Sequence, residues 1–232
     1  TESDLIGSRE VPKSALYGVQ TLRGIENFRI SKFHLNEYPL FIQALAITKM
    51  GAAVANRELD LLTEEQADAI LKACKEILEG KHHDQFPVDM IQGGAGTTTN
   101  MNANEVIANR ALELMGHQRG EYQYCSPNDH VNRSQSTNDA YPTAIHIGLY
   151  YTHLKLVKHF EVLIESFRKK ATEFAHVIKM GRTQLEDAVP MTLGQTFNGF
   201  ASILRHEVKN LDFAAQDFLT VNMGATAIGT GI

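Results

Sequence analysis

Two long apolar stripes with helical spacing run through the last third of the 232-residue chain. The first predicts one helix at about 140–175, with apolar residues at Ile145, Leu149, Leu156, Phe160, Leu163 and Phe167. The second predicts a helix from near Pro190 to about Asn222, with Leu193, Phe197, Phe200, Leu204, Leu211 and Phe218 along it. Both exceed the usual ~10–14 residues, and an isolated antiparallel pair leaves much apolar surface uncovered. We therefore expect these helices to pack in a bundle between subunits.

The preceding part of the chain predicts shorter helices. Residues 39–59 are rich in helix formers and contain no interior proline, which predicts a helix over that span. Thr63 and Gln66 form a capping-box pattern and Gly80 is placed to end a helix, so residues 64–79 predict another. Residues 1 to about 36 are expected to be loops, with room for one short hairpin.

A stretch rich in glycine and threonine at residues 89–102, DMIQGGAGTTTNMN, is expected to be irregular. It leads directly into ANEVIANRALELM, which predicts a helix closed by Gly116. The predicted fold class is therefore mainly α.

The composition argues against several classes of protein. With 43% hydrophobic residues, the chain can bury a substantial core. The net charge is −5 and no basic block stands out, which argues against nucleic-acid binding. No leader pattern or membrane-length apolar run occurs, so we expect a cytoplasmic protein without membrane contact. Cys74 and Cys125 match no metal or redox spacing and are expected to be reduced thiols, with a disulfide as the alternative.

Three short segments place hydroxyl and amide side chains beside a turn: GGAGTTTN at 93–100, QSTND at 135–139 and GRTQLED at 181–187. Ser136, Thr137 and Asn138 are residue types that cap helices, and they precede the first long helix. A helix N-terminus with hydroxyl donors is a natural seat for a carboxylate. Capping alone explains any one of the segments, whereas the three together favour an anion site.

Other sequence features give weaker indications of chemistry. His82, His83 and Asp84 could suggest a metal, but they follow a predicted helix end without further ligands at suitable spacing, which favours a solvated loop. The chain contains no phosphate loop, dinucleotide fingerprint or serine-hydrolase elbow. Nucleotide binding and serine hydrolysis therefore lack support.

Five longer motifs resemble aspartate ammonia-lyases, a branch of the fumarase/aspartase superfamily, over essentially the whole chain. They are GGAGTTTNMNANE, MGHQRGEYQY, NDHVNRSQSTNDAYPT, KMGRTQLEDAVPMTLGQ and NMGATAIGTG. Members of the superfamily eliminate a group from the β-position of a succinyl compound and form fumarate. The resemblance implies L-aspartate and fumarate as substrate and product. It also implies a mostly helical N-terminal domain at 1–138 and, at 139–232, the first long helices of a truncated central helical bundle.

Several positions differ from class II fumarases, the other branch considered. Fumarases usually carry serine at the position of Ala95 and histidine at that of Ser126, and they read Ser-Ser-Asn where this chain has Ser-Thr-Asn. Gln184 stands where fumarases have histidine, although aspartate ammonia-lyases carry either residue. The segment GHQRGEYQY also resembles aspartate ammonia-lyases specifically.

The resemblance also implies roles for individual residues. In the family a base removes a proton from the carbon next to the β-carboxylate, which becomes an enolate-like dianion before ammonia leaves. Stabilising that charge is the main catalytic task. Matching positions imply that the β-carboxylate is bound by Thr97, Ser136, Thr137, Thr183 and Gln184. Asn138 would help to orient the amino group. Arg23 also matches a family arginine, with a surface or inter-subunit salt bridge as the alternative role.

The base itself is expected to lie outside these residues. In the superfamily it is a serine in a mobile loop of the form GSSxMPxKxN, and no serine of this chain stands in that pattern. We therefore expect the 232-residue polypeptide alone to be inactive. The resemblance implies a homotetramer whose active sites take residues from three subunits, no required cofactor, and a divalent cation as an activator in some members. Class II fumarase and a non-catalytic, assembling fragment are the alternatives.

Overall fold

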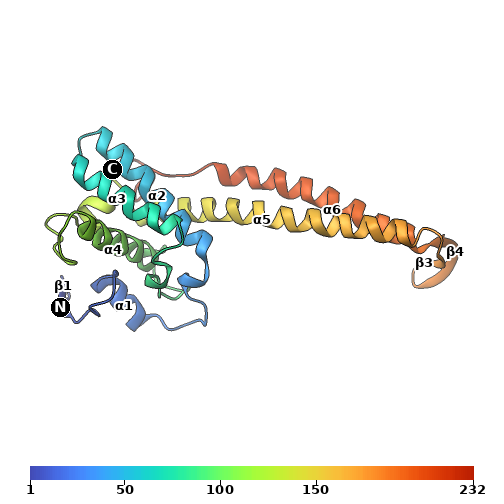
Figure 1. Cartoon of the computed structure of the whole chain (residues 1–232), viewed down its shortest axis with the longest axis horizontal. Coiled ribbons are helices and arrows are strands. Elements are labelled where there is room, and N and C mark those ends of the chain that lie inside the picture. The colour runs from blue at the N-terminus through green and yellow to red at the C-terminus, as the bar shows by residue number, and fades with distance from the viewer. The chain divides into compact units, whose positions relative to one another are not determined.

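The computed structural model describes residues 1–232 and confirms the mainly α fold (Figure 1). The helices are α1 (Val19–Asn27), α2 (Pro39–Glu58), α3 (Glu64–Leu78), α4 (Thr97–Leu114), α5 (Thr137–Glu173) and α6 (Leu193–Ala215). Two hairpins are formed by β1 (Glu2–Asp4) with β2 (Gly7–Arg9) and by β3 (Ile178–Thr183) with β4 (Glu186–Thr192). Short 3-10 segments lie at Leu35–Glu37, His83–Gln85 and Gln216–Leu219, and a π-helical turn lies at Pro127–Val131.

The chain divides into two compact units, and each is described by itself. The first unit comprises Thr1–Leu149 together with Thr220–Ile232, and the second comprises Tyr150–Leu219. The expected domain ranges, 1–138 and 139–232, stay a prediction.

Helices α2, α3 and α4 form the core of the first unit, where they lie side by side (Figure 1). Helix α3 buries one face, whereas α4 is buried on nearly all sides. The apolar side chains shared among the three helices include Ile42, Leu45, Ile70, Ile77, Ile107 and Leu112, each at most 1% exposed. Removing such a side chain from water stabilises a fold by about 1.5–3 kcal/mol. The two helices expected at 39–59 and 64–79 are confirmed.

Helix α3 begins as the sequence predicts. The Thr63 hydroxyl accepts the Gln66 amide at 3.2 Å, and the Gln66 side chain accepts the Thr63 amide at 3.2 Å. At the other end, Gly80 has φ +87°, a left-handed conformation that glycine adopts without steric cost.

Helix α1 was not expected, because residues 1–36 were assigned to loops and a hairpin. Its start is held by the buried carboxylate of Glu105 from α4, which accepts the backbone amides of Gly18, Gln20 and Thr21 at 2.8–3.0 Å. A Cβ at Gly18 would lie within 2.9 Å of the Glu105 side chain, so this close approach requires glycine. The helix thus depends on a contact more than eighty residues away in the chain.

The prediction of irregular structure throughout 89–102 was wrong, since α4 already begins at Thr97. The residues TTTNMN have modest helix propensity, but Thr99, Asn100 and Asn102 are buried in the first unit. Tertiary burial therefore outweighs local propensity. The helix still ends as expected, just before Gly116.

In the second unit, the end of α5 packs against α6 through aromatic side chains. Phe167 has ring centroids at 6.0 Å from Phe197 and 5.6 Å from Phe200. His153 is 9% exposed and contacts Asp212 at 2.9 Å. The long helix expected at 140–175 is confirmed with a start three residues earlier.

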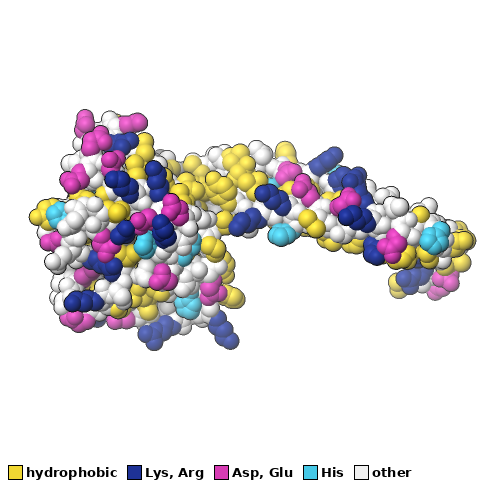
Figure 2. All heavy atoms as spheres, viewed as in Figure 1, with side chains coloured by type: hydrophobic (Ala, Val, Ile, Leu, Met, Phe, Trp, Pro, Cys, Tyr) yellow, Lys and Arg dark blue, Asp and Glu magenta, His cyan; other side chains and the backbone are white.

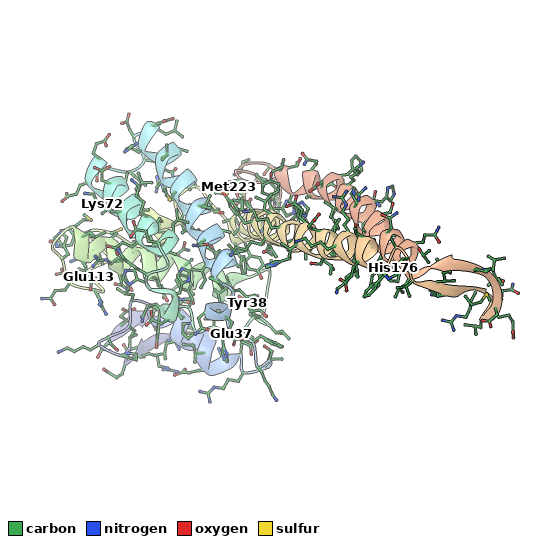
Figure 3. The ribbon with its side chains drawn as sticks, turned by 45° about the vertical axis from the view of Figure 1, so that its right-hand side comes forward. Glu37, Tyr38, Lys72, Glu113, His176 and Met223 are labelled. Atoms are coloured by element: carbon green, nitrogen blue, oxygen red, sulfur yellow. The ribbon has the colours of Figure 1, made fainter.

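The helix expected from Pro190 to Asn222 is shorter than predicted. Pro190 lies in β4, and α6 begins only at Leu193, where Thr192 supplies the side-chain cap and Gln195 completes a capping box. The hairpin of β3 and β4 follows His176, which is labelled in Figure 3. Helical periodicity did not reveal this hairpin, because its apolar residues alternate over a short span.

Much of the apolar stripe on α5 and α6 remains exposed, as the yellow atoms of Figure 2 show. Leu156, Leu163 and Phe200 are each more than 40% exposed. Acidic and basic side chains are interspersed on the face that Figure 2 draws. None of the helices combines the length and apolar character required to cross a bilayer.

Arg110 joins two helices of the first unit through ion pairs. Its guanidinium donates to the Glu76 carboxylate at 2.6 and 2.8 Å and to Glu113 at 2.8 Å. Figure 3 labels Glu113, which also accepts from Arg119 at 2.6 Å. The hydrogen bonds from Arg110, and then from His82, hold the pKa of Glu76 at about 2, below its ordinary 4.5.

Replacing a core isoleucine should destabilise the first unit. We expect Ile70→Ala, at a fully buried position on α3, to lower the free energy of unfolding by about 2–5 kcal/mol because a cavity remains. Ile30→Ala, at a side chain that is 61% exposed, should change it by less than about 0.5 kcal/mol. Urea titrations followed by circular dichroism measure both. Equal losses would contradict the assignment of the core.

The Glu76–Arg110 pair should make stability depend on acid pH. Because the folded-state pKa of Glu76 is depressed, its contribution is complete above about pH 4.5 and is lost as pH falls toward 2. Between about pH 4.5 and pH 2, the free energy of unfolding should therefore fall less for Arg110→Gln than for the unmodified protein. Arg168→Gln is the control, since its 3.9 Å pair with Glu165 is half exposed. Parallel pH profiles for unmodified protein and Arg110→Gln would contradict the account.

Candidate functional site

The N-termini of α4 and α5 are joined by one side-chain hydrogen bond in the first unit. Asn100, three residues after Thr97 at the start of α4, donates from Nδ2 to the Thr137 hydroxyl oxygen at 3.2 Å. Thr137 is the first residue of α5. The structure thus links two of the three polar segments that the sequence singled out.

Gly96 shapes the start of α4. It precedes the helix with φ +90°, and a Cβ there would overlap the ring of Tyr141 on α5. The Thr99 amide, which lacks a partner within the helix, donates to the Gln92 side chain at 2.8 Å. Glycine is therefore required both for the backbone conformation and for the close approach of α5.

Asp139 shapes the start of α5. Its buried carboxylate accepts the backbone amide of Ser136 at 2.9 Å and those of Gly224 and Thr226 at 3.1 and 2.9 Å. A negative side chain in the first turn also favours the positive end of the helix dipole. Asp139 therefore holds the Ser-Thr-Asn turn against the returning segment 220–232, to which Met223, labelled in Figure 3, belongs.

The hydroxyls of Ser136 and Thr137 are arranged as donors. The Ser136 hydroxyl oxygen accepts the Asn138 amide at 3.2 Å, and that of Thr137 accepts from Asn100. Because each oxygen already accepts a hydrogen bond, each O–H can donate to an incoming anion. They sit at the positive end of a 37-residue helix. This arrangement can bind a carboxylate and stabilise added negative charge on it.

Asn138 is exposed beside the same turn. Its side-chain NH₂ group donates to the Ala227 backbone carbonyl at 2.8 Å. The backbone carbonyl of Asn138 accepts from the Asn222 side chain at 3.1 Å. An open pocket of about 670 Å³ adjoins this turn. It is lined by Met90, Ile91, Gln92, Gly94, Ala95, Gly96, Asn138, Tyr141, Pro142 and Ile145.

Sequence reasoning missed a buried lysine behind the turn. Lys49 of α2 is 1% exposed, and its ammonium donates to side-chain oxygens of Asn100, Asn132 and Gln135 at 2.8–2.9 Å. Burial lowers the pKa of Lys49 to about 7, while the charge of Asp139 acts in the opposite direction. A lysine in the otherwise apolar run ALAITKMGAAVA was the one signal available.

Thr183 and Gln184 lie in the second unit and not in the first. They end β3 and enter the turn to β4, where Gln184 and Leu185 have φ +47° and +71°. Two consecutive left-handed residues form the type of tight turn that matches the twist of a hairpin. Both predicted site residues are exposed. The first unit therefore contains Ser136, Thr137 and Asn138 at the start of α5 and Thr97 at the start of α4, and the second unit contains this pair.

Arg23 and the histidines have structural partners within the chain. Arg23 donates to both carboxylate oxygens of Asp4 at 2.8 Å, which makes a largely buried intrachain ion pair. His82 contacts Glu76 at 2.7 Å, and His83 contacts the Ile77 carbonyl at 2.8 Å. The chain contains no cluster of three or more metal-ligating side chains.

The thiols of Cys74 and Cys125 are both free and buried. Burial raises the pKa of each to about 12, so neither is a reactive thiolate near neutral pH.

The fold agrees with the comparisons to known proteins. Residues 7–232 match the model of the lyase family, and the chain belongs to that family. The chain is 57% identical over 232 residues to aspartate ammonia-lyase of Escherichia coli K12, covering 100% of this chain and 48% of that protein. The chain thus spans about half the length of the curated relatives it matches.

Solved structures show the same fold. Fumarate lyase:delta crystallin from Brucella melitensis bound to cobalt superposes with a TM-score of 0.94 at 52% identity, covering 100% of this chain and 50% of that one. Class II fumarase from Schistosoma mansoni gives 0.91 at 37% identity, covering 100% and 48%. The expected resemblance to aspartate ammonia-lyases within the fumarase/aspartase superfamily is confirmed.

Substituting Gly96 tests how the site is positioned. Gly96→Ala and Gly116→Ala both place a side chain at positive φ, which costs about 1–2 kcal/mol. Only Gly96→Ala also collides with Tyr141, since the space at Gly116 is open. We expect the larger loss of unfolding free energy and a changed near-ultraviolet tyrosine signal for Gly96→Ala alone. Matching behaviour of the two variants would refute the role of this contact.

Proposed function

We propose that the protein to which this chain belongs is an aspartate ammonia-lyase, which reversibly converts L-aspartate to fumarate and ammonia. The observation that carries the proposal is the pair of hydroxyl donors, Ser136 and Thr137, at the N-terminus of a 37-residue helix. Identity of 57% to aspartate ammonia-lyase against 37% to class II fumarase supports the choice of substrate.

The proposed reaction proceeds through a dianion. A base takes the proton from the carbon that bears the β-carboxylate, and the C–H electron pair moves onto the carboxylate oxygens. This electron pair then forms the C=C bond as the C–N bond breaks. The electrons of the C–N bond leave with nitrogen, which is released as ammonia. The most demanding charge therefore develops on the β-carboxylate, where preorganised donors act most strongly.

The proposed roles follow from the types of group available. Hydroxyl and amide donors strengthen their hydrogen bonds as the carboxylate gains charge, without ionising themselves. In this role we place Thr97, Ser136, Thr137, Thr183 and Gln184. The carbonyl oxygen of the Asn138 side chain is suited to the substrate ammonium, because its NH₂ group already binds Ala227. The proton-abstracting base belongs to the glycine–serine loop described above.

The assembly proposed is a homotetramer with shared active sites. One observation supports it: the apolar stripe on α5 and α6 is exposed. We further propose cytoplasmic localisation, no required cofactor, activation by a divalent cation, and no turnover by residues 1–232 alone. Aspartate turnover by the isolated 232-residue polypeptide would overturn the last point.

The reaction is tested with protein expressed from its complete reading frame. Fumarate formation is followed by its absorbance with L-aspartate or L-malate as substrate. We expect turnover of L-aspartate and none of L-malate. Turnover of malate alone would instead identify a fumarate hydratase, and turnover of neither would favour a non-catalytic assembly role.

The Thr137 hydroxyl should contribute strongly to the rate. Thr137→Val removes one donor to the developing charge, and we expect kcat with L-aspartate to fall by about 10²–10³-fold. Thr143→Val is the matched control on α5, because its buried hydroxyl has no hydrogen-bond partner. The control should retain activity within about threefold. Equal kcat values for Thr137→Val and the control would remove Thr137 from the site.

A further inference from the structure

We propose that Asn100 is a positioning residue that directs the Thr137 hydroxyl hydrogen toward the substrate carboxylate, and that buried Lys49 fixes the orientation of Asn100. This inference rests on the proposed function, because it assigns a task to the same carboxylate site. It concerns two residues that do not themselves contact the substrate.

Lys49 determines the orientation of the Asn100 amide. An ammonium group only donates hydrogen bonds, so each atom that it contacts must be an acceptor. The Asn100 atom 2.8 Å from Lys49 Nζ is therefore the amide oxygen. With Lys49 in its ammonium form, this fixes which end of the Asn100 amide faces α5.

The nitrogen of the Asn100 amide faces Thr137 and Asn132. Asn100 Nδ2 carries two hydrogens, and it lies 3.2 Å from the Thr137 hydroxyl oxygen and 3.1 Å from Asn132 Oδ1. Both contacts are acceptors for these hydrogens. The Thr137 oxygen therefore accepts, and its own hydrogen has to point away from Asn100.

Further buried hydrogen bonds hold Asn132 beside Lys49 and Asn100. Asn132 Oδ1 also accepts from Lys49 at 2.9 Å and from Asn104 at 3.1 Å, and Asn132 Nδ2 donates to the Gln135 carbonyl at 3.1 Å. The side chains of Lys49 and Asn100 are each only 1% exposed. The Asn100 amide is thus held at both ends, by Lys49 at its oxygen and by Thr137 and Asn132 at its nitrogen, which restricts its rotation. Thr137 thus meets the substrate with its donor already oriented, which lowers the cost of reorganisation in the transition state.

Asn100→Asp tests the orientation directly. The carboxylate keeps an acceptor for Lys49 but removes the donor to Thr137, whose hydroxyl then turns inward to donate to Asp. We expect kcat with L-aspartate to fall by about 10²-fold. A nitronate analogue of the dianionic intermediate should lose affinity by about the same factor, whereas succinate, which resembles the ground state, should lose about threefold or less.

The matched control is Asn102→Asp on the same helix. Asn102 is also fully buried, but its amide donates to the Gln85 carbonyl and has no link to Thr137. Folded Asn102→Asp should lower kcat by about threefold or less, because the change does not reach Thr137. In a Thr137→Val background, Asn100→Asp should likewise add about threefold or less, because the effect acts through the missing hydroxyl. A fully additive effect would show that the new charge acts through space and would overturn the proposal.

The outcomes separate this inference from the proposed function. No L-aspartate turnover by the unmodified protein would reject the function, whereas normal turnover by folded Asn100→Asp would reject only the positioning role. If that variant does not fold, neutron diffraction of the unmodified protein makes the test. The Thr137 hydrogen should point away from Asn100, and a hydrogen directed at Asn100 would overturn the proposal.

Discussion

The contact of Lys49 with three amide oxygens is the interaction on which the first unit depends. A buried ammonium without partners would cost far more than any single hydrogen bond returns, so its acceptors have to stay in place. Those acceptors come from α4 and from the turn that precedes α5. One charge on α2 therefore fixes the relative position of two helix termini, and those termini carry the hydroxyl donors of the candidate site.

The same constraint explains why polar residues are concentrated inside this unit. Asn100, Asn102 and Asn104 lie near the start of α4 at no more than 1% exposure, where a buried helix would normally place leucine or isoleucine. Buried amides are tolerated when they are hydrogen-bonded, and each of these three donates to a partner. The core thus gives up apolar burial along one helix to hold a precise polar arrangement at its N-terminus.

Periodicity and capping patterns predicted α2, α3 and α5 because those signals are local. The start of α4 could not be predicted in this way, since burial of Thr99 and Asn100 overrides their weak propensity. Lys49 was missed for a related reason: its partners Asn132 and Gln135 lie more than eighty residues away in the chain. The roles of Thr97 and Thr183 were reached through family resemblance and not through any local physical signal.

The central claim is that the hydroxyls at the start of α5 bind the substrate β-carboxylate. A crystal structure of the protein from its complete reading frame, with succinate bound, measures this directly. The account predicts a carboxylate oxygen about 2.5–3.0 Å from the Ser136 and Thr137 hydroxyls. Succinate bound elsewhere in the active protein, with neither hydroxyl in contact, would contradict it.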